Sequence, residues 1–420
     1  MNSIFPTARP LLSQGGLSFG DGADASAPFV LISKQDCLIG LGVADRLPPV
    51  PRDRVAALLP GFFAEAAARG DGAQGDGPGL LVGAIPFDAD KPVHLFQPRR
   101  VERNPARLDG AFGPADEPES STPVRRGSGW RLRAEPAPEI YAGHVAAALE
   151  AMAGDEPALR KVVLARSLLL DTDAPLDVVR LLKILQTDAS ATTYAVPLPV
   201  TPGGVSRTLV GATPELLVEK AGPRVRSFPL AGSARRQPHA TADRAAAEAL
   251  AQSDKDRREH AAVVEAILDA LTPYCRTLTA DGPELTSTAT MWHLATRIEG
   301  VLKDEGVSSL ELAGVLHPTP AVCGLPRDPA RALIGRLEPV DRGFFTGAVG
   351  WCDGRGDGRW YVAIRCAEIA GHRARLYAGA GIVPGSLPQA EVAETDAKFM
   401  TMLNALQLGD DVITVAGAAR

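Results

Sequence analysis

The amino-acid sequence predicts an α+β fold, in which an antiparallel sheet is covered on its outside by helices. Strand-like and helical runs alternate after residue 129. Near the C-terminus, the runs FFTGAVGWC and RWYVAIRCAEIA flank the turn-forming segment DGRGDG, and RARLYAGAGIV follows. This arrangement predicts an antiparallel meander. No segment repeats at a fixed period, so a solenoid is not expected.

The elements can be assigned in chain order from their residue patterns. KVVLARSLLL, at 161–170, is aliphatic and β-branched and predicts a strand. LDVVRLLKIL then predicts a helix, YAVPLPV and TLVGATPELLVEK predict strands, and RREHAAVVEAILDALTPY predicts a long helix. Two segments rich in glycine, proline and aspartate, 69–79 and 109–129, are expected to be loops. The second is a candidate for a weak internal boundary.

Composition narrows the class of function. With 420 residues, of which 45% are apolar, the chain can bury a large core. The net charge is −6 and the basic residues are scattered, so a small-molecule ligand is expected rather than nucleic acid or a membrane surface. The five cysteines are far apart and form no CxxC pair, which argues against disulfides and structural zinc. No signal peptide or membrane span is recognisable, and we expect a cytoplasmic protein.

A buried carboxylate is predicted on the long helix. Ser253 followed by Asp256 resembles a capping box at its start. Glu259 lies one turn before Val263, so its carboxylate points along the apolar stripe and needs a partner. An internal ion pair with Lys255, one turn earlier, is one alternative.

A second acidic cluster occurs near the C-terminus. Glu391, Glu394 and Lys398 share one helix face, where the two carboxylates repel each other and a cation would relieve the repulsion. A solvated Glu394–Lys398 pair is the alternative. Oxygen ligands without a histidine or cysteine cluster would select Mg²⁺. Carboxylates on two separate helices, with water in the remaining positions, are typical of a magnesium that also binds an anionic substrate.

Arg365 is predicted to face a ligand. Strict alternation in WYVAIRCAEI places it between Ala363 and Ala367 on one strand face, where space is left for a carboxylate. The alternative is an exposed strand face on which Arg365 pairs with Glu368 or Asp357. The following AGAGIVPGS supplies glycines whose backbone N–H groups could approach an anion.

Lys161 opens the apolar strand, on the same face as Val163, Ala165 and Ser167. A lysine in a partly dry pocket can serve as a base. Most lysines at strand ends are simply exposed, which is the alternative here.

Nine segments together carry a family resemblance. In this order, KVVLARS, GATPELLVEK, FPLAGSARR, SDKDRREH, MWHLATRIEG, LHPTPAVCGLPRDPA, GFFTGAVGWCD, VAIRCAEI and YAGAGIVPGSLPQAEVAETDAKF resemble the signature segments of the chorismate-utilising enzymes. The resemblance is strongest to the isochorismate synthases of catechol siderophore biosynthesis. It is dense from Ile140 to Leu408 and loose over residues 1–135.

The resemblance implies roles for the unusual residues. Lys161 would be the general base that activates water against carbon 2 of chorismate, and Glu215 the general acid that protonates the departing hydroxyl at carbon 4. Both would then hold the less common protonation state at neutral pH, a neutral amine and a neutral carboxyl. Glu259 and Glu394 would bind Mg²⁺, with Glu391 reaching the metal through water, and the metal would bind the ring carboxylate of the substrate.

The resemblance also implies a substrate pocket. Arg365 and the backbone at Gly381 would bind the enolpyruvyl carboxylate. The complete set of expected substrate-binding residues is Gly232, Ser233, His293, Ala321, Val322, Ile364, Arg365, Tyr377, Gly381 and Lys398.

The expected activity is isochorismate synthase, an isomerase (hydroxymutase) that serves siderophore biosynthesis. Related enzymes that use ammonia generally have threonine where this chain has Ser233, and the chain contains no glutaminase-like module, so water is the expected nucleophile and no glutaminase subunit is expected. Thr213 and Cys323 depart from the usual pattern, which leaves a salicylate synthase that also eliminates pyruvate as an alternative. A non-catalytic chorismate-binding protein is another.

The fold implied by the resemblance is the large chorismate-utilising enzyme fold, an antiparallel sheet sandwich with helices outside. Residues 1–420 would form a single catalytic domain of two pseudo-symmetric halves, expected to be monomeric. The segment 109–129 then becomes a surface loop and not a linker between domains.

Overall fold

The computed structural model describes residues 27–34, 36–68, 79–103, 129–154, 159–201 and 203–408. The predicted loop at 109–129 lies outside these residues except for Gly129, and the predicted loop at 69–79 lies outside them except for Gly79. No described helix is long and apolar enough to cross a bilayer.

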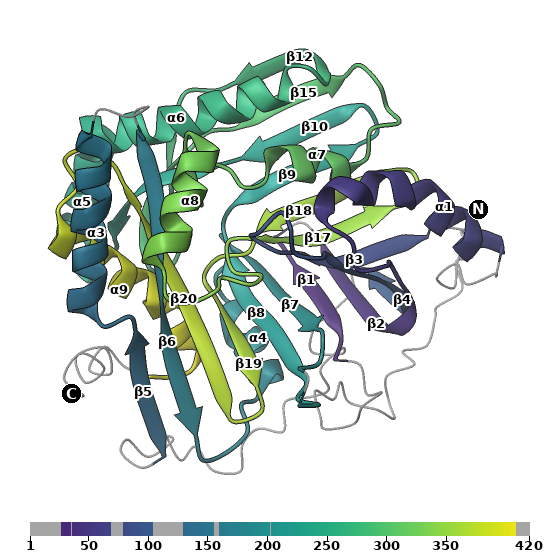
Figure 1. Cartoon of the computed structure of the whole chain (residues 1–420), viewed down its shortest axis with the longest axis horizontal. Coiled ribbons are helices and arrows are strands. Elements are labelled where there is room, and N and C mark those ends of the chain that lie inside the picture. Colours follow the sequence, from purple (N-terminus) through teal and green to yellow (C-terminus); the bar gives the residue numbers. More distant parts are fainter. Residues whose placement is uncertain are drawn as a thin grey trace, which may run out of the picture.

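One large sheet of seventeen strands organises the described residues (Figure 1). All of its strand pairs are antiparallel, and each strand below is paired with the next. The first half of the series is β5 (Trp130–Glu135), β6 (Lys161–Thr172), β20 (Arg373–Ile382), β19 (Cys366–Ala370), β8 (Arg207–Thr213), β7 (Thr192–Leu198), β1 (Phe29–Ile32), β2 (Cys37–Arg46) and β4 (His94–Arg103). The short β16 (Gly324–Leu325) also pairs with β6.

The second half of the series continues from β4 through strands that lie far apart in sequence. Its strands are β3 (Leu80–Ile85), β17 (Ala348–Asp353), β18 (Gly358–Val362), β9 (Leu216–Ala221), β10 (Arg224–Phe228), β15 (Ile298–Leu302) and β12 (Cys275–Ala280). A separate three-stranded sheet contains β11 (Leu230–Arg235), β14 (Met291–Ala295) and β13 (Glu284–Ser287).

Two of the points at which the chain passes from one half of the large sheet to the other lie next to each other. Pro214 and Glu215 separate β8 from β9, and residues 363–365 separate β18 from β19. Two backbone hydrogen bonds join these crossings: Ala212 N–H donates to the Arg365 carbonyl at 3.1 Å, and Val362 N–H donates to the Glu215 carbonyl at 3.1 Å. Both crossings therefore lie side by side between the two halves.

The predicted C-terminal meander is only partly correct. Strand β17 pairs with β18 and β19 pairs with β20, as expected. Strands β18 and β19 pair instead with β9 and β8, because the chain changes sheet half between them. Arg365 has a left-handed φ of 51°, so it does not alternate with Ala363 and Ala367 on one strand face. TLVGATPELLVEK is likewise two strands, broken at Pro214.

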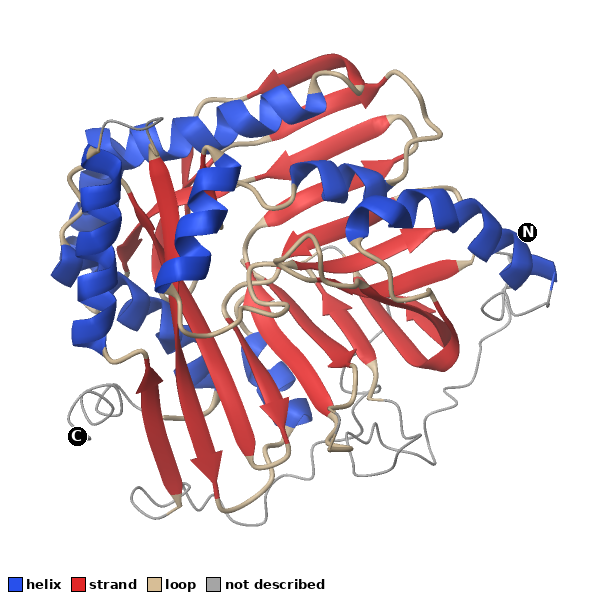
Figure 2. Ribbon diagram, in the orientation of Figure 1, coloured by secondary structure: helices blue, strands red, loops and turns tan. Residues whose placement is uncertain are grey.

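Helices cover the outer faces of the sheet (Figure 2), which confirms the predicted α+β class. Helices α3, α8 and α9 pack on β6 or β20, and α6 and α7 pack over the β9 and β12 region of the second half. The helices are α1 (Val55–Ala68), α3 (Pro138–Ala153), α4 (Val178–Leu185), α5 (Ala240–Gln252), α6 (Asp254–Leu271), α7 (Ser309–Leu316), α8 (Arg327–Leu337) and α9 (Pro388–Ala405), with the 3₁₀ turn η1 (Arg52–Arg54).

Helix α6 shows why these sequences form these elements. The Ser253 side chain accepts a hydrogen bond from the Asp256 backbone N–H at 3.2 Å and so caps the helix, as predicted. His260, Val263 and Ile267 then recur at helical spacing and are buried. This packing fixes the rotation of the helix about its axis and thereby the direction in which Glu259 points.

Candidate active site

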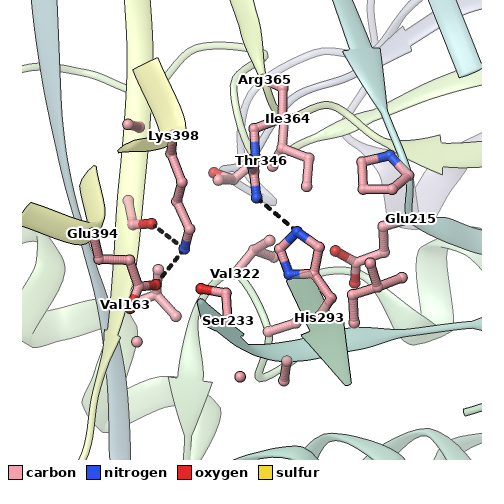
Figure 3. Close-up of a pocket in the computed structure, with 18 of the residues that line it drawn as sticks. Val163, Glu215, Ser233, His293, Val322, Thr346, Ile364, Arg365, Glu394 and Lys398 are labelled. Atoms are coloured by element: carbon pink, nitrogen blue, oxygen red, sulfur yellow. Dashed lines mark hydrogen bonds and ion pairs between the residues drawn. The ribbon is translucent and has the colours of Figure 1, made fainter. Parts of the chain in front are cut away.

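A cavity opens beside the two chain crossings and contains about 670 Å³, its open mouth included. Residues from β6 and β20, from the two chain crossings, from β11 and β14, and from α6 and α9 line it (Figure 3). The predicted site residues among them are Glu215, Gly232, Ser233, Glu259, His293, Ala321, Val322, Ile364, Arg365, Tyr377, Gly381, Glu394 and Lys398.

Two predicted site residues, Lys161 and Glu391, do not line the cavity directly. Lys161 lies behind Gly381, where a Cβ atom would come within 3.2 Å of the lysine Cε and 2.3 Å of Glu259 Oε1. Only glycine therefore fits at position 381 without displacing both charged side chains. Glu391 is buried beside the cavity with 1% of its surface exposed.

Lys161 and Glu259 form a buried ion pair. Their Nζ and Oε1 atoms are 2.8 Å apart, and the side chains are 2% and 9% exposed. This arrangement contradicts the alternative of an exposed lysine at a strand end. It also contradicts the alternative pairing of Glu259 with Lys255, because Lys255 Nζ binds Glu391 Oε1 at 3.1 Å.

Glu394 also has a lysine partner. Lys398 Nζ donates to Glu394 Oε1 at 2.6 Å and to the Gly379 carbonyl at 2.8 Å. Their side chains are only 23% and 16% exposed, so the pair is not the solvated surface pair considered as an alternative. Burial raises the pKa of Glu394, but Lys398 outweighs this effect and the pKa lies below its ordinary value. Glu394 is therefore a carboxylate facing the cavity.

Glu215 has the opposite character. It is 3% exposed, and burial raises the pKa of its carboxyl to about 8, although Lys161, the Leu230 backbone N–H and Arg365 oppose the shift. Its side chain points into the cavity from the first chain crossing (Figure 3). At neutral pH this carboxyl is largely protonated and can donate a proton.

Arg365 extends from the second crossing and is 5% exposed. Its Nη2 lies 3.2 Å from His293 Nε2, and its buried Nη1 has no hydrogen-bond partner among the described residues. Burial, together with Arg365 and Lys398, lowers the pKa of His293 well below its ordinary value, so the imidazole is neutral at pH 7. A buried cation with an unused donor suits an anionic ligand.

The predicted alternative partners of Arg365 are both engaged elsewhere. Glu368 Oε1 accepts from Arg207 at 2.7 Å, and Asp357 Oδ1 accepts from Lys220 at 2.9 Å. The exposed strand face considered for Arg365 is therefore wrong.

Comparisons with known proteins agree with this geometry. Residues 111–407 match the family described as chorismate binding enzyme. This chain belongs to the chorismate-utilising enzymes. Isochorismate synthase DhbC of Bacillus subtilis is 42% identical over 381 residues, which cover 90% of this chain and 93% of that protein. Isochorismate synthase EntC of Escherichia coli K12 is 40% identical over 354 residues, which cover 83% and 85%.

A solved structure confirms the fold. The crystal structure of a putative 2,3-dihydroxybenzoate-specific isochorismate synthase, DhbC from Bacillus anthracis, superposes with a TM-score of 0.82 at 39% identity. The match covers 91% of this chain and 96% of that one. Within the chorismate-utilising enzymes, this chain therefore groups with the isochorismate synthases.

Several cavity residues of this chorismate-utilising enzyme were not predicted individually. Phe345 stacks on Tyr377, with ring centroids 4.9 Å apart and an interplanar angle of 10°. Its neighbour Thr346 has a φ of 58°, which no local pattern indicates for a threonine. The two adjacent phenylalanines in GFFTG could have indicated Phe345 as a residue of the site. The lining residues that were missed are Val163, Pro214, Leu230, Ala231, Phe345, Thr346, Ala378 and Gly379.

The predicted metal site can be judged by its donors. No group of three or more histidine, cysteine, aspartate or glutamate side chains converges as a metal cage within the described part of the chain, so Glu391 does not join Glu259 and Glu394 in a closed site. Glu259 and Glu394 nevertheless line the same cavity from α6 and α9. Two carboxylates at an open cavity fit Mg²⁺, which keeps several water ligands.

Proposed function

We propose that this chain is an isochorismate synthase, which converts chorismate to isochorismate by adding water at carbon 2 with loss of the carbon 4 hydroxyl. The observation that carries the proposal is the chemistry of the cavity beside the two chain crossings. It contains a protonated carboxyl (Glu215), two carboxylates (Glu259 and Glu394) and a buried arginine with an unused donor (Arg365). The names of the relatives support the same activity.

In the proposed reaction, the bond between the water oxygen and carbon 2 forms, both ring double bonds shift by one position, and the carbon 4 to oxygen bond breaks. Lys161 takes a proton from the attacking water, and Glu215 gives its proton to the departing hydroxyl, which leaves as water. The protonated state of Glu215 near pH 7 supports this assignment. One proton is taken up and one released, so the reaction is balanced without another reactant.

Substrate binding is assigned to the charged residues around the cavity. Arg365 Nη1 and the backbone at Gly381 would hold the enolpyruvyl carboxylate, and His293 orients Arg365 through its Nε2 atom. Glu259 and Glu394 would hold Mg²⁺, and the metal, when bound, supplies positive charge to the ring carboxylate of the substrate. The partly buried pair of Glu391 with Lys255 borders this region and is assigned a supporting role.

The proposal extends to the biological setting. The 2,3-dihydroxybenzoate specificity named for the Bacillus anthracis structure favours use of the isochorismate for siderophore precursors. Pairing of β1 with β7 and of β3 with β17 supports one catalytic domain that includes the N-terminal third. We infer a monomeric, cytoplasmic enzyme that uses water and needs no glutaminase subunit.

The proposal is tested by incubating the purified chain with chorismate and Mg²⁺ and separating the products by chromatography. Isochorismate as the sole product is expected. Salicylate together with pyruvate would instead identify a salicylate synthase, and saturable chorismate binding without any product would identify a non-catalytic binding protein.

A further inference from the structure

Strand β6 has a gap in the pairing of one edge close to Lys161. On this edge β16 pairs with Lys161 and Val162, and β5 pairs with β6 from Ser167 to Thr172. Residues 163–166 have no strand partner on this edge among the described strands. The backbone groups of Val163 and Ala165 that face the gap need other partners, because a buried, unpaired backbone group is costly.

A buried ion pair fills this gap. Arg342 Nη2 donates to the Val163 carbonyl at 2.7 Å, and Glu338 Oε1 accepts from the Ala165 backbone N–H at 2.8 Å. Arg342 Nε donates to Glu338 Oε2 at 2.8 Å, and the two side chains are 3% and 5% exposed. The Arg342 donor and the Glu338 acceptor thus make two hydrogen bonds that a neighbouring strand would otherwise make with β6.

The same guanidinium reaches two further walls of the cavity. Arg342 Nη1 donates to the Val322 carbonyl at 2.7 Å and to Thr346 Oγ1 at 3.3 Å. With its bonds to Glu338 and Val163, all five N–H donors of Arg342 are used. Val163, Val322 and Thr346 all line the active-site cavity. The guanidinium also lies 4.4 Å from the centroid of the Phe87 ring, which limits its movement.

We propose that Glu338 and Arg342 are a positioning pair for the reaction. The pair holds the β6 segment that begins at Lys161, the loop at Val322 and the turn at Thr346 at fixed mutual distances. This inference rests on the proposed function, in which Lys161 and the surrounding wall place the attacking water. Neither side chain of the pair lines the cavity, so neither is a catalytic residue.

Stability alone does not explain this pair. A buried ion pair commonly adds no more stability than well-packed apolar residues of similar volume, because desolvation offsets the attraction. A planar guanidinium with five directed donors instead fixes several acceptors in one geometry, which an ammonium or an apolar side chain cannot do. Small displacements of reacting groups are costly to rate, since about 1 Å can lower it roughly 100-fold.

The test is the variant Arg342→Lys, which keeps the charge and removes the directed fork. We expect kcat to fall about 10-fold or more while KM for chorismate stays within about threefold, because the groups assigned to substrate binding remain. Arg359→Lys is the matched control. Arg359 is partly buried and paired with Glu219 and Asp36, none of which line the cavity, so this variant should lose stability but keep kcat.

The kcat values of Arg342→Lys and Arg359→Lys are measured well below the melting temperature of each variant. A normal kcat in folded Arg342→Lys, with a loss of stability like that of Arg359→Lys, would overturn the proposal. If Arg342→Lys does not fold, Glu338→Gln is used as the test in its place. Glutamine keeps the shape of the glutamate side chain and an oxygen that can accept from the Ala165 backbone N–H. Its kcat should fall with little change in KM, and an unchanged kcat would overturn the proposal. Failure of the proposed function would appear in the identity of the product that the wild-type chain forms. The role of Glu338 and Arg342 is judged separately, on the ratio of variant kcat to wild-type kcat.

Discussion

The Nζ atom of Lys161 lies 2.8 Å from Oε1 of Glu259, and Gly381 packs against both side chains. The proposed base and a proposed metal ligand are therefore direct neighbours. Any cation that Glu259 binds at the cavity shares this carboxylate with Lys161. This contact couples the two functions assigned to the site.

Lys161→Ala should abolish turnover and leave chorismate binding largely intact. General-base catalysis contributes about 100- to 10,000-fold to rate, so kcat should fall by at least the lower factor. Chorismate affinity is measured by calorimetry on the same preparation. Lys220→Ala is the control, since Lys220 is an equally buried lysine that pairs with Asp357 away from the cavity. Normal turnover by Lys161→Ala would show that the base is another group.

The pH dependence of the rate should report Glu215. Its pKa is raised to about 8 and the reaction uses its protonated form, so the rate should fall as pH rises through about 8. This limb is measured as kcat against pH. Glu215→Gln should lower kcat about 100-fold or more and remove the limb, because the amide donates no titrating proton. An unchanged limb in this variant would assign the titration to a different group.

The same shift should appear in stability. A carboxyl whose folded pKa is raised from 4.5 to about 8 stabilises the fold fully below pH 4.5, and this contribution is lost by the time pH passes about 8. Wild-type unfolding free energy should therefore decline over this range by more than that of Glu215→Gln. Denaturant titrations at several pH values measure the difference, and parallel curves for the two proteins would contradict the raised pKa.

Arg365→Lys should mainly weaken substrate binding. Lysine cannot both contact His293 and present a second donor to the cavity, so one charge-assisted hydrogen bond, worth about 1.5–3 kcal/mol, is lost. KM for chorismate should rise roughly 10- to 100-fold. Arg359→Lys again serves as control. An unchanged KM and chorismate affinity would remove Arg365 from the binding site.

Metal dependence should map to Glu259 and Glu394. Chelation should abolish turnover, and added Mg²⁺ should restore it. Glu394→Gln should weaken binding of Mn²⁺, used as a paramagnetic probe, by about 10-fold or more. Glu368→Gln, in which the altered glutamate pairs with Arg207 outside the cavity, should bind Mn²⁺ normally. Equal Mn²⁺ affinity in wild type and Glu394→Gln would exclude Glu394 as a ligand.

The α+β fold class was predictable from the residues, but the path of the chain between the two halves of the large sheet was not. Aliphatic β6 and the capped, amphipathic α6 form where their patterns predict. The meander prediction is wrong at Arg365, because alternation of side chains carries no information about a left-handed φ of 51°. The change of sheet half at that point depends on pairing of β18 and β19 with strands distant in sequence.

Prediction of the site residues from the sequence was limited in a similar way. From spacing alone, Lys255 was the visible partner for Glu259, because helical neighbours can be read from a sequence whereas a lysine on a distant strand cannot. The local pattern indicated Lys161 as a possible base, but only the family resemblance assigned it that role and identified Glu215. Neither the local sequence pattern nor the family resemblance identified Glu338 and Arg342. Their spacing is that of an ordinary solvated pair, and their burial follows only from the gap in β6.

The central claim is that water attacks carbon 2 while the carbon 4 hydroxyl departs, and isotope labelling tests it most directly. Chorismate is incubated with the chain and Mg²⁺ in ¹⁸O-labelled water, and the product is analysed by mass spectrometry early in the reaction. Isochorismate with one ¹⁸O atom, located at carbon 2, is the predicted result. Isochorismate that retains only the original oxygen atoms would contradict the account.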